Sequence, residues 1–554
     1  MLQRHRTELF LVLAGLVLFV PGLGAVHLFD WDEINFAEIA REMIATGEYL
    51  RPQVNYQPFW EKPPLFSWMQ VLTMQAFGVG EFAARLPNAL CGLLTLVLLH
   101  RMGTRLHDST FGLLWALAYL GSVLPHLYFR SGIIDPWFNL FIFLAIHQFI
   151  LGRWAQRDVP GMVLHSPWRR HALGSGLFLG LATLTKGPTA ILIAGLTAGI
   201  WLIRQRFRGF VDVKFLALVA LATAGASFLW FGIETWKNGP WFLTEFVTYQ
   251  YRLFSTPDAG HAGFPGYHFV VLLIGCFPAS LFMIPELLRP TRGNAQQQDH
   301  RLWMVILFWV VLLLFTIVKS KIVHYSSMCY FPLTYLAALH LRRLWLGEVR
   351  AGLGLRIGLG VVGGLFALIT LVLPYLGMHV ELILPLFSQD PFARANMEAQ
   401  VGWTGWEALA GVWMLAVLVI GLQALRKAEA RKGIRVLFGG TAIFIFLTLY
   451  FFIGRIEGYS QRAAINFYKE SQGEPSYVIT RNFRSYAHLF YTRITPPGDP
   501  RAYDQEWLLH GEIDRPVYVV CKETSAAEVD SIATLNKLGH RNGFHFYKRE
   551  LPAP

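Results

Sequence analysis

The chain has 554 residues, of which 54% are apolar and only 15% are charged. An ordinary soluble domain is about 25% charged, so this composition excludes that class and predicts a polytopic membrane protein. The formal net charge is +12, but the basic residues recur in short clusters between apolar runs. That pattern is typical of cytoplasmic loops and does not indicate a nucleic-acid partner.

Apolar runs that are long enough to cross a bilayer recur along most of the chain. A helix needs roughly 20 apolar residues to span about 30 Å of hydrocarbon. The candidate runs lie near residues 8–28, 84–103, 111–127, 133–152, 172–186, 188–203, 215–233, 267–289, 302–319, 325–341, 355–377, 405–425 and 436–454. The sequence therefore predicts a mainly α membrane domain of about 13 transmembrane helices over residues 1–455, followed by a soluble domain over residues 456–554.

The connections between these runs alternate in charge. Arginine and lysine gather near residues 101–105, 153–170, 204–214, 289–301, 342–350 and 426–435. By the positive-inside rule, these connections and the N-terminus face the cytoplasm. An odd number of spans then places the first connection (residues 28–84) and the C-terminal domain on the outer side of the membrane.

The first outer connection carries two predicted helices. Over residues 34–46 the apolar residues recur at helical spacing, with Glu38, Arg41 and Glu42 on the opposite face. This pattern predicts an amphipathic helix that lies in the membrane interface. A second helix is expected to begin at Leu65, after Pro63-Pro64, because proline is tolerated where a helix starts.

The last hundred residues differ in composition from the rest. Strands are predicted at residues 476–480, 516–521 and 544–547, and helices at residues 484–491 and 525–538. Alternation of strands and helices predicts a small α/β domain. It contains no glycine fingerprint for a nucleotide, so no catalysis of its own is assigned to it.

Carboxylates cluster at the start of the first outer connection. Asp32, with Glu33 beside it, directly follows the first apolar run, and Asp135 stands at the outer end of the fourth. Glycosyl transfer passes through an oxocarbenium-like state and uses a carboxylate to remove a proton from the acceptor or to stabilise charge on the sugar. The alternative for these acids is a helix cap or a solvated loop.

Three lysines lie on the predicted outer side. They are Lys62 in Glu61-Lys62-Pro63-Pro64, Lys186 between the fifth and sixth runs, and Lys321 after the ninth. The positive-inside rule gives no reason for the last two. Lysine suits a phosphate oxygen, so together they predict a pocket for a phosphate-bearing ligand. A surface ion pair for Lys62 and snorkelling for Lys186 are the alternatives.

Two histidines, His261 and His268, lie in the outer connection before the eighth run. A histidine paired with a carboxylate is able to hold a divalent ion such as zinc. A lone histidine in a loop is more often simply solvated. The spacing of these residues does not decide between the two readings.

Several ordered motifs resemble those of a known family. They are Asp32-Glu33-x-x-Phe36-Ala37-Glu38-Ile39-Ala40-Arg41-Glu42-Met43, Glu61-Lys62-Pro63, Asp135-Pro136, Leu184-Thr185-Lys186-Gly187 and Lys319-Ser320-Lys321-x-x-x-Tyr325. In order and topology they resemble the bacterial aminoarabinose transferases, which are grouped with the protein O-mannosyltransferases in the GT-C superfamily. The resemblance covers about residues 1–455 and does not extend to the sequence of the C-terminal domain.

The resemblance implies an inverting glycosyltransferase on the periplasmic face of the bacterial inner membrane. Such an enzyme takes a sugar, here 4-amino-4-deoxy-L-arabinose, from a polyprenyl-phosphate carrier and gives it to lipid A or another envelope acceptor. A protein acceptor, as in the mannosyltransferases, is the alternative. Where the family has Lys-Leu-Pro-x-Tyr, this chain has Lys321-Ile322-Val323-His324-Tyr325, and Pro64 replaces an aliphatic residue. These departures concern the identity of donor and acceptor more than the reaction.

The resemblance also implies roles for individual residues. Asp32, Glu33 and Asp135 are expected at the catalytic centre. The expected ligands of the donor and its phosphate are Lys62, Lys186, Lys321, Tyr325 and Arg41. A zinc ion would be held by Glu61 and His261.

Two other function classes fit the sequence less well. A transporter or flippase of lipid-linked sugars would place ionisable residues near the middle of its helices, whereas here they lie at the outer ends. A non-catalytic scaffold would leave the outer lysines unexplained.

Overall fold

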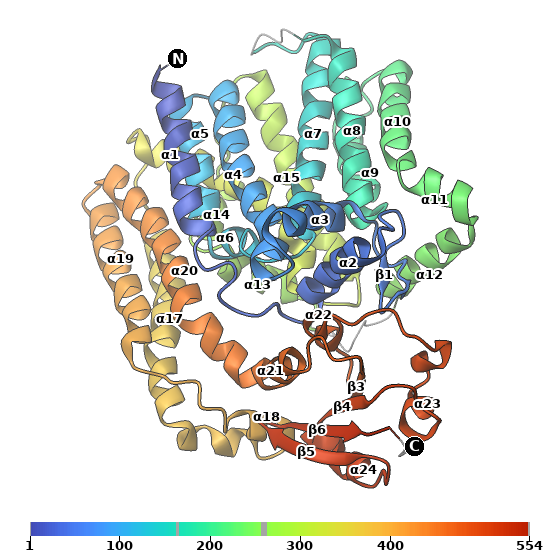
Figure 1. Cartoon of the computed structure of the whole chain (residues 1–554). Helices are drawn as coiled ribbons and strands as arrows, with labels where there is room; N and C mark the ends of the chain where they lie inside the picture. The colour runs from blue at the N-terminus through green and yellow to red at the C-terminus, as the bar shows by residue number, and fades with distance from the viewer. Residues whose placement is uncertain (1, 162–165, 256–262, 552–554) are drawn as a thin grey trace.

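The computed structural model describes residues 2–161, 166–255 and 263–551. A bundle of long helices fills one part of the molecule, and a small sheet domain lies beyond one end of it (Figure 1). The N-terminus lies at the opposite end of the bundle from the sheet domain.

The bundle is built from helices that follow the predicted apolar runs, except for α12 (Trp241–Ser255), which lies in the connection between the seventh and eighth runs. They are α1 (Leu2–Phe19), α4 (Glu81–Leu106), α5 (Ser109–Leu120), α6 (Val123–Tyr128), α7 (Asp135–Arg157), α8 (Trp168–Lys186), α9 (Thr189–Arg204), α10 (Val213–Phe228), α11 (Phe231–Asn238), α12 (Trp241–Ser255), α13 (Tyr267–Gly275), α14 (Ala279–Leu288), α15 (Ala295–Ile317), η2 (Val323–Cys329), α16 (Tyr330–Trp345), α17 (Leu353–Met378), α19 (Leu409–Arg426) and α20 (Ala430–Ser460). Short turns η3 (Val380–Leu382), η4 (Leu384–Phe387), α18 (Pro391–Asn396) and η5 (Trp406–Ala408) connect α17 to α19.

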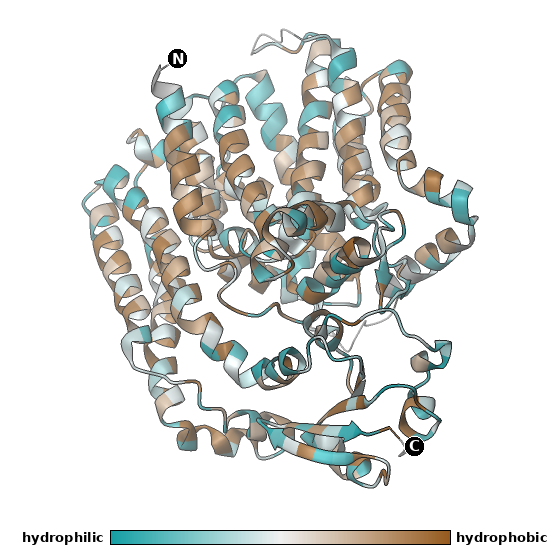
Figure 2. Ribbon diagram, viewed as in Figure 1, coloured by the Kyte–Doolittle hydropathy of each residue, from teal (hydrophilic) through white to brown (hydrophobic). Residues whose placement is uncertain are grey.

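The helices carry apolar surface along their length and polar residues at their ends (Figure 2). Within the described residues, 6 helices are long and apolar enough to cross a membrane, or 8 if the bent pairs α10–α11 and α13–α14 each form one span. Every predicted apolar run contains at least one helix. The protein is therefore a multi-pass membrane protein of mainly α structure, as predicted, and the number of thirteen spans stays a prediction.

The first outer connection folds as α2 (Asp32–Thr46), the short hairpin β1 (Gln53–Val54) and β2 (Gln57–Pro58), and α3 (Leu65–Phe77). Both predicted helices are present. The polar face of α2 is not exposed, however, since Glu38 and Glu42 are fully buried and Arg41 is 6% exposed. The guanidinium of Arg41 donates two 2.7 Å hydrogen bonds to Glu38. This pairing offsets the loss of hydration and allows α2 to be covered on all sides.

The C-terminal domain contains α21 (Arg462–Glu470), β3 (Tyr477–Arg481), α22 (Ala487–Thr492), η6 (Pro500–Tyr503), α23 (Gln505–His510), β4 (Val517–Lys522), η7 (Glu523–Ser525), α24 (Ala526–Asp530), β5 (Asn536–Arg541) and β6 (Phe544–Arg549). Its strands form one sheet in the order β3-β4-β6-β5, with β3 parallel to β4 and the other pairs antiparallel. The predicted α/β domain is thus present. Because α20 runs on to Ser460, the globular part begins at α21 rather than at residue 456.

The predicted helix over residues 525–538 is wrong beyond Asp530. The chain leaves α24 there and enters β5, which pairs with β6. Asn542 and Gly543 connect these strands with positive φ values of 49° and 77°. An Asn-Gly pair favours a tight hairpin of this kind, so the turn chemistry rather than the preceding helical pattern decides the fold of this segment.

The two faces of the sheet pack against different partners. Val517, Val519 and Tyr547 lie in a core with Leu508 and Leu509 of α23. Val520 and Phe546 lie in a second core, which they share with α21, α22 and residues of α2 such as Phe36 and Met43. The C-terminal domain and the first outer connection therefore form one packed unit.

Candidate active site

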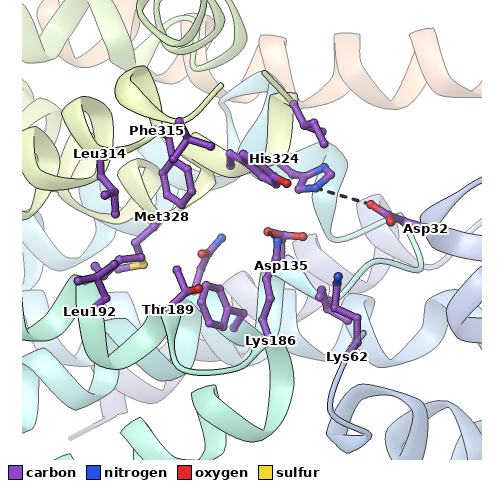
Figure 3. A pocket seen from close by; sticks show the side chains of 17 residues that line it. Asp32, Lys62, Asp135, Lys186, Thr189, Leu192, Leu314, Phe315, His324 and Met328 are labelled. Carbon is purple, nitrogen blue, oxygen red and sulfur yellow. Dashed lines mark hydrogen bonds and ion pairs between the residues drawn. The ribbon is translucent and has the colours of Figure 1, made fainter. Parts of the chain in front are cut away.

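A cavity of about 190 Å³ opens between the first outer connection, the ends of α7 to α9, and the segment from α15 to η2 (Figure 3). Its charged and polar lining residues are Asp32, Lys62, Asp135, Asn139, Lys186, Thr189, His324 and Tyr325. Its apolar lining residues are Ile134, Phe138, Leu192, Ile193, Leu314, Phe315, Val318, Ile322 and Met328. Figure 3 shows the labelled charged side chains toward one side of the cavity and Leu192, Leu314, Phe315 and Met328 toward the other.

An ion pair joins two helix ends at the charged side. Asp135 is the first residue of α7, and Lys186 is the last residue of α8. Lys186 Nζ donates a 2.6 Å hydrogen bond to Asp135 Oδ1. Gly187 ends α8 with a positive φ of 91°, a conformation that side chains with a Cβ adopt at a cost, so the chain turns directly after Lys186 into α9. Asp135 does not cap α7.

One oxygen of the Asp135 carboxylate accepts no hydrogen bond from the described residues. The Asp135 side chain is only 3% exposed, and its Oδ2 atom has no hydrogen-bond partner among the described residues. A buried oxygen without a donor is unfavourable by about 1–3 kcal/mol. The arrangement favours a ligand that brings a hydroxyl or ammonium donor to this position.

Asp32 belongs to the same charged side of the cavity as the ion pair (Figure 3). It is the first residue of α2, and its side chain is 41% exposed. His324 Nε2 lies 3.6 Å from Asp32 Oδ2 (Figure 3). Burial lowers the pKa of His324 and the nearby carboxylates of Asp135 and Asp32 oppose this, with a net lowering. The imidazole is therefore neutral at neutral pH, and its contact with Asp32 is not an ion pair.

Two lysines face this part of the cavity. Lys186 Nζ lies 5.6 Å from the ring centre of Tyr325 and 5.7 Å from that of Phe138, which hold the ammonium group between aromatic faces. Lys62 enters from the first outer connection beside Asp32 (Figure 3). Two ammonium groups above an apolar wall suit a phosphate that carries a long hydrocarbon chain.

Some predicted site residues lie elsewhere. Glu33 accepts hydrogen bonds of 2.9 and 2.7 Å from the Arg85 guanidinium and one of 2.6 Å from the Gly132 amide. Burial alone would raise the pKa of Glu33, but Arg85 and the backbone amides lower it. The carboxylate is thus ionised and fully engaged in joining α2 to α4, outside the cavity lining.

Arg41 and Lys321 are also engaged away from the cavity. Arg41 is paired with Glu38 inside the packed unit described above. Lys321 Nζ donates to the carbonyl oxygens of Phe315, Thr316 and Val318, at 3.1, 2.7 and 2.5 Å. The lysine therefore satisfies the carboxyl end of α15, which explains an outer-side lysine without a phosphate.

The predicted zinc ligands are not brought together in the part of the chain that the structure describes. Glu61 is half-buried and precedes Lys62, while His261 lies outside the described residues. Among residues 2–161, 166–255 and 263–551, no three His, Cys, Asp or Glu side chains gather as a metal site would require. Zinc stays a prediction, and no step of the reaction is derived through it.

Three polar cavity residues, Asn139, Thr189 and His324, were not among the predicted site residues. His324 stands in the motif before Tyr325, but its pairing with Asp32 joins residues 292 positions apart and has no local signal. Asn139 lies one turn after Asp135 and donates a 2.8 Å hydrogen bond to Ser327 Oγ in η2. A polar residue inside an apolar run, on the same helix face as an acid, is a signal that could have indicated Asn139.

Known proteins resemble this chain in sequence. Residues 61–230 match the model of the family described as dolichyl-phosphate-mannose-protein mannosyltransferase. The undecaprenyl phosphate-alpha-4-amino-4-deoxy-L-arabinose arabinosyl transferase of Edwardsiella ictaluri is 31% identical over 378 residues, which are 66% of this chain and 65% of that protein. Its namesake from Erwinia tasmaniensis is 27% identical over 76% of this chain and 73% of that protein. The matched part is thus less than two thirds of the length of the first of these relatives.

The likeness in three dimensions covers nearly the whole chain. The crystal structure of ArnT from Cupriavidus metallidurans, bound to undecaprenyl phosphate, superposes with a TM-score of 0.76 at 20% identity, over 98% of this chain and 97% of that one. The chain therefore has the fold of this protein. The fold predicted from the motifs is confirmed, and the superposition includes the C-terminal domain, which the motifs did not cover.

Proposed function

We propose that this protein is an inverting glycosyltransferase that moves a sugar from a polyprenyl-phosphate carrier to an acceptor of the cell envelope. The observation that carries the proposal is the cavity itself, in which Asp32, Asp135, Lys62 and Lys186 face one end of an apolar wall. A lipid-linked sugar phosphate has the same division into an anionic head and a hydrocarbon tail. The relatives named as arabinosyl transferases that act on undecaprenyl phosphate support 4-amino-4-deoxy-L-arabinose as the sugar.

The proposed reaction is a single displacement at the anomeric carbon. The bond between that carbon and the carrier's phosphate oxygen breaks as the bond to the acceptor oxygen forms on the opposite face. Lys62 and Lys186 stabilise the charge that returns to the departing phosphate. Asp32 removes the proton of a hydroxyl acceptor or, if the acceptor is an ionised phosphate, orients the sugar. Asp135 Oδ2 accepts a hydrogen bond from a hydroxyl or ammonium group of the donor sugar.

We propose the bacterial inner membrane as the location, with the N-terminus cytoplasmic and the C-terminal domain periplasmic. The basic connections support this orientation. So does the position of the N-terminus at the end of the bundle opposite the C-terminal domain (Figure 1). Lipid A is the proposed acceptor, and a protein hydroxyl is the alternative that the match to the mannosyltransferase family favours.

The test uses the purified full chain in lipid vesicles with undecaprenyl-phosphate aminoarabinose. Lipid A and a serine-rich peptide are offered as acceptors, and products are detected by mass spectrometry. We expect lipid A to gain the mass of one aminoarabinose residue. Transfer to the peptide alone would support the alternative acceptor. Movement of the donor between leaflets without any product would contradict the proposed reaction and support a flippase.

A further inference from the structure

A polar hollow on the C-terminal domain has no part in the reaction described above. It has a volume of about 670 Å³ and is lined by Thr480, Asn482, Phe483, Arg484, Ser485, Tyr486 and Gln505. These residues come from the carboxyl end of β3, from the connection to α22 and from the start of α23. In open sheets, ligands commonly bind outside the carboxyl ends of parallel strands, and β3 and β4 are parallel.

The hollow lies directly beside the catalytic cavity. Its Ser485 hydroxyl and Tyr486 amide both donate hydrogen bonds to Asp30, and the Tyr486 ring packs edge-on against Trp31 with 5.6 Å between ring centres. Asp30 and Trp31 are the residues before Asp32. Burial, and then the negative charge of Glu61, the neighbour of Lys62, raise the pKa of Tyr486 to about 12. The hollow is therefore joined through Asp30 and Trp31 to Asp32, which lines the cavity.

One side chain gives the hollow its charge. Arg484 is the only charged residue among those that line it. Its side chain is exposed and makes no hydrogen bond or ion pair to the described part of the chain. Apart from Phe483, the other lining residues carry hydroxyl or amide groups and no charge, and some of these groups already donate within the protein, as Ser485 does to Asp30 and Asn482 to Glu528. The planar guanidinium of Arg484 therefore gives the hollow its preference for an anion, and its fork of donors suits two oxygens of a phosphate.

We propose that this hollow is the acceptor subsite and that Arg484 binds a phosphate group on the head of the acceptor lipid. This inference rests on the proposed function and names the feature by which the acceptor is recognised. The acceptor would lie across the hollow and reach Asp32 past Trp31, while the donor enters the cavity from the apolar side. Arg484 is a specificity residue that does not touch the reacting atoms.

The test measures transfer from undecaprenyl-phosphate aminoarabinose to lipid A and to lipid A from which one phosphate has been removed, so that a group able to accept the sugar is still present. We expect Arg484→Ala to raise the KM for lipid A about tenfold, the loss typical of one charge-assisted hydrogen bond. The kcat and the KM for the donor stay unchanged. With the lipid A that lacks the phosphate bound by Arg484, the wild-type protein and Arg484→Ala show the same raised KM. Arg484→Lys retains part of the affinity because it keeps the charge.

The matched control is Arg541→Ala, which removes an exposed arginine from β5 in the same domain and is expected to change nothing. The inference is overturned if Arg484→Ala keeps the wild-type KM for lipid A, or if it raises the KM of the donor instead, which would place the carrier's phosphate at Arg484. If the wild-type protein transfers no sugar, the proposed function fails. In that case the Kd for lipid A is measured for two inactive proteins, Asp32→Asn and the double variant Asp32→Asn/Arg484→Ala. Equal Kd values in the two proteins would contradict a phosphate contact at Arg484.

Discussion

Lys186 and Asp135 show how single residues determine what the cavity can bind. They are 51 positions apart, yet their charged atoms lie 2.6 Å apart at the ends of neighbouring helices. The pair is nearly buried, so each charge depends on the other and on whatever ligand reaches Asp135 Oδ2. Lys186 was predicted because the positive-inside rule gives no reason for a lysine on the outer side, and Asp135 because glycosyl transfer uses a carboxylate and because of the family resemblance.

Replacement of Lys186 tests the phosphate contact. We expect Lys186→Met to lower kcat/KM for the lipid-linked donor about a hundredfold, since a positive group that stabilises the leaving phosphate is lost. Steady-state transfer assays measure the effect. Lys319→Met is the control, because Lys319 is an exposed lysine in the connection after α15 that does not line the cavity. Equal losses in the two variants would argue against a specific role of Lys186.

Other residues could not be placed from the sequence alone. Lys321 satisfies the last carbonyls of its own helix, and Glu33 meets an arginine 52 positions away. From the sequence alone, Lys321 cannot be told apart from Lys62, nor Glu33 from Asp32, because the pattern of charges does not show where each side chain points. The sequence therefore singled out these charges as one group, and only tertiary contacts separate those that face the cavity from those that support the fold.

The helix α2 is the element on which the site depends, because it carries Asp32 at its first position and is buried over most of its length. Its sequence pattern predicts a helix, and the structure has one. The pattern also suggests a polar face, yet Glu38, Arg41 and Glu42 are covered by the hairpin β1–β2 and the C-terminal domain. A helix with paired charges on one face has an amphipathic sequence pattern whether that face is exposed to water or packed against protein, so the pattern alone does not predict its burial.

The contact of α2 with α4 predicts a loss of stability rather than of chemistry. Arg85→Met leaves the Glu33 carboxylate buried without its partner, and we expect the free energy of unfolding to fall by about 3–5 kcal/mol. Thermal unfolding in detergent measures this loss. The double variant Glu33→Gln/Arg85→Met should recover part of it. If instead Glu33→Gln unfolds normally but loses turnover, Glu33 is catalytic as the sequence suggested.

The buried acids of α2 predict a pH dependence. Burial, and then the nearby Glu38 carboxylate, raise the pKa of Glu42 from 4.5 to about 9. A raised folded-state pKa means that the stabilising contribution is complete below pH 4.5 and is lost as the pH rises toward 9. We expect Glu42→Gln, which mimics the neutral acid, to raise the unfolding temperature more at pH 8 than at pH 5. A larger gain at pH 5 would contradict a protonated Glu42.

At the scale of the whole molecule, the C-terminal domain is bound to the catalytic connection at several separate points. The Leu28 amide donates a 2.7 Å hydrogen bond to the Tyr491 hydroxyl, and the Tyr56 hydroxyl donates one of 2.7 Å to the Ile494 carbonyl. Asp30 accepts from Ser485 and Tyr486, as described above. The domain therefore fixes the position of Asp32 relative to the helix bundle, which the sequence could not show because these contacts join segments more than 400 residues apart.

Loss of this docking should be visible without any assay of activity. Asp30→Ala removes the acceptor of the Ser485 and Tyr486 hydrogen bonds. We expect faster amide hydrogen exchange in both residues 28–35 and residues 482–494, with unchanged exchange in β5 and β6. Asp390→Asn, at an exposed turn, is the control. An increase confined to residues 28–35 would mean that the C-terminal domain does not depend on this contact.

The most direct test of the central claim is sugar transfer by Asp32→Asn compared with the wild-type protein. Both are reconstituted in vesicles with labelled undecaprenyl-phosphate aminoarabinose and lipid A, and binding of unlabelled undecaprenyl phosphate is measured in parallel. The cavity geometry predicts that Asp32→Asn binds the carrier as the wild type does but transfers sugar at least about a hundredfold more slowly. Transfer at the wild-type rate by a folded Asp32→Asn protein would contradict the assignment of this cavity as the catalytic site.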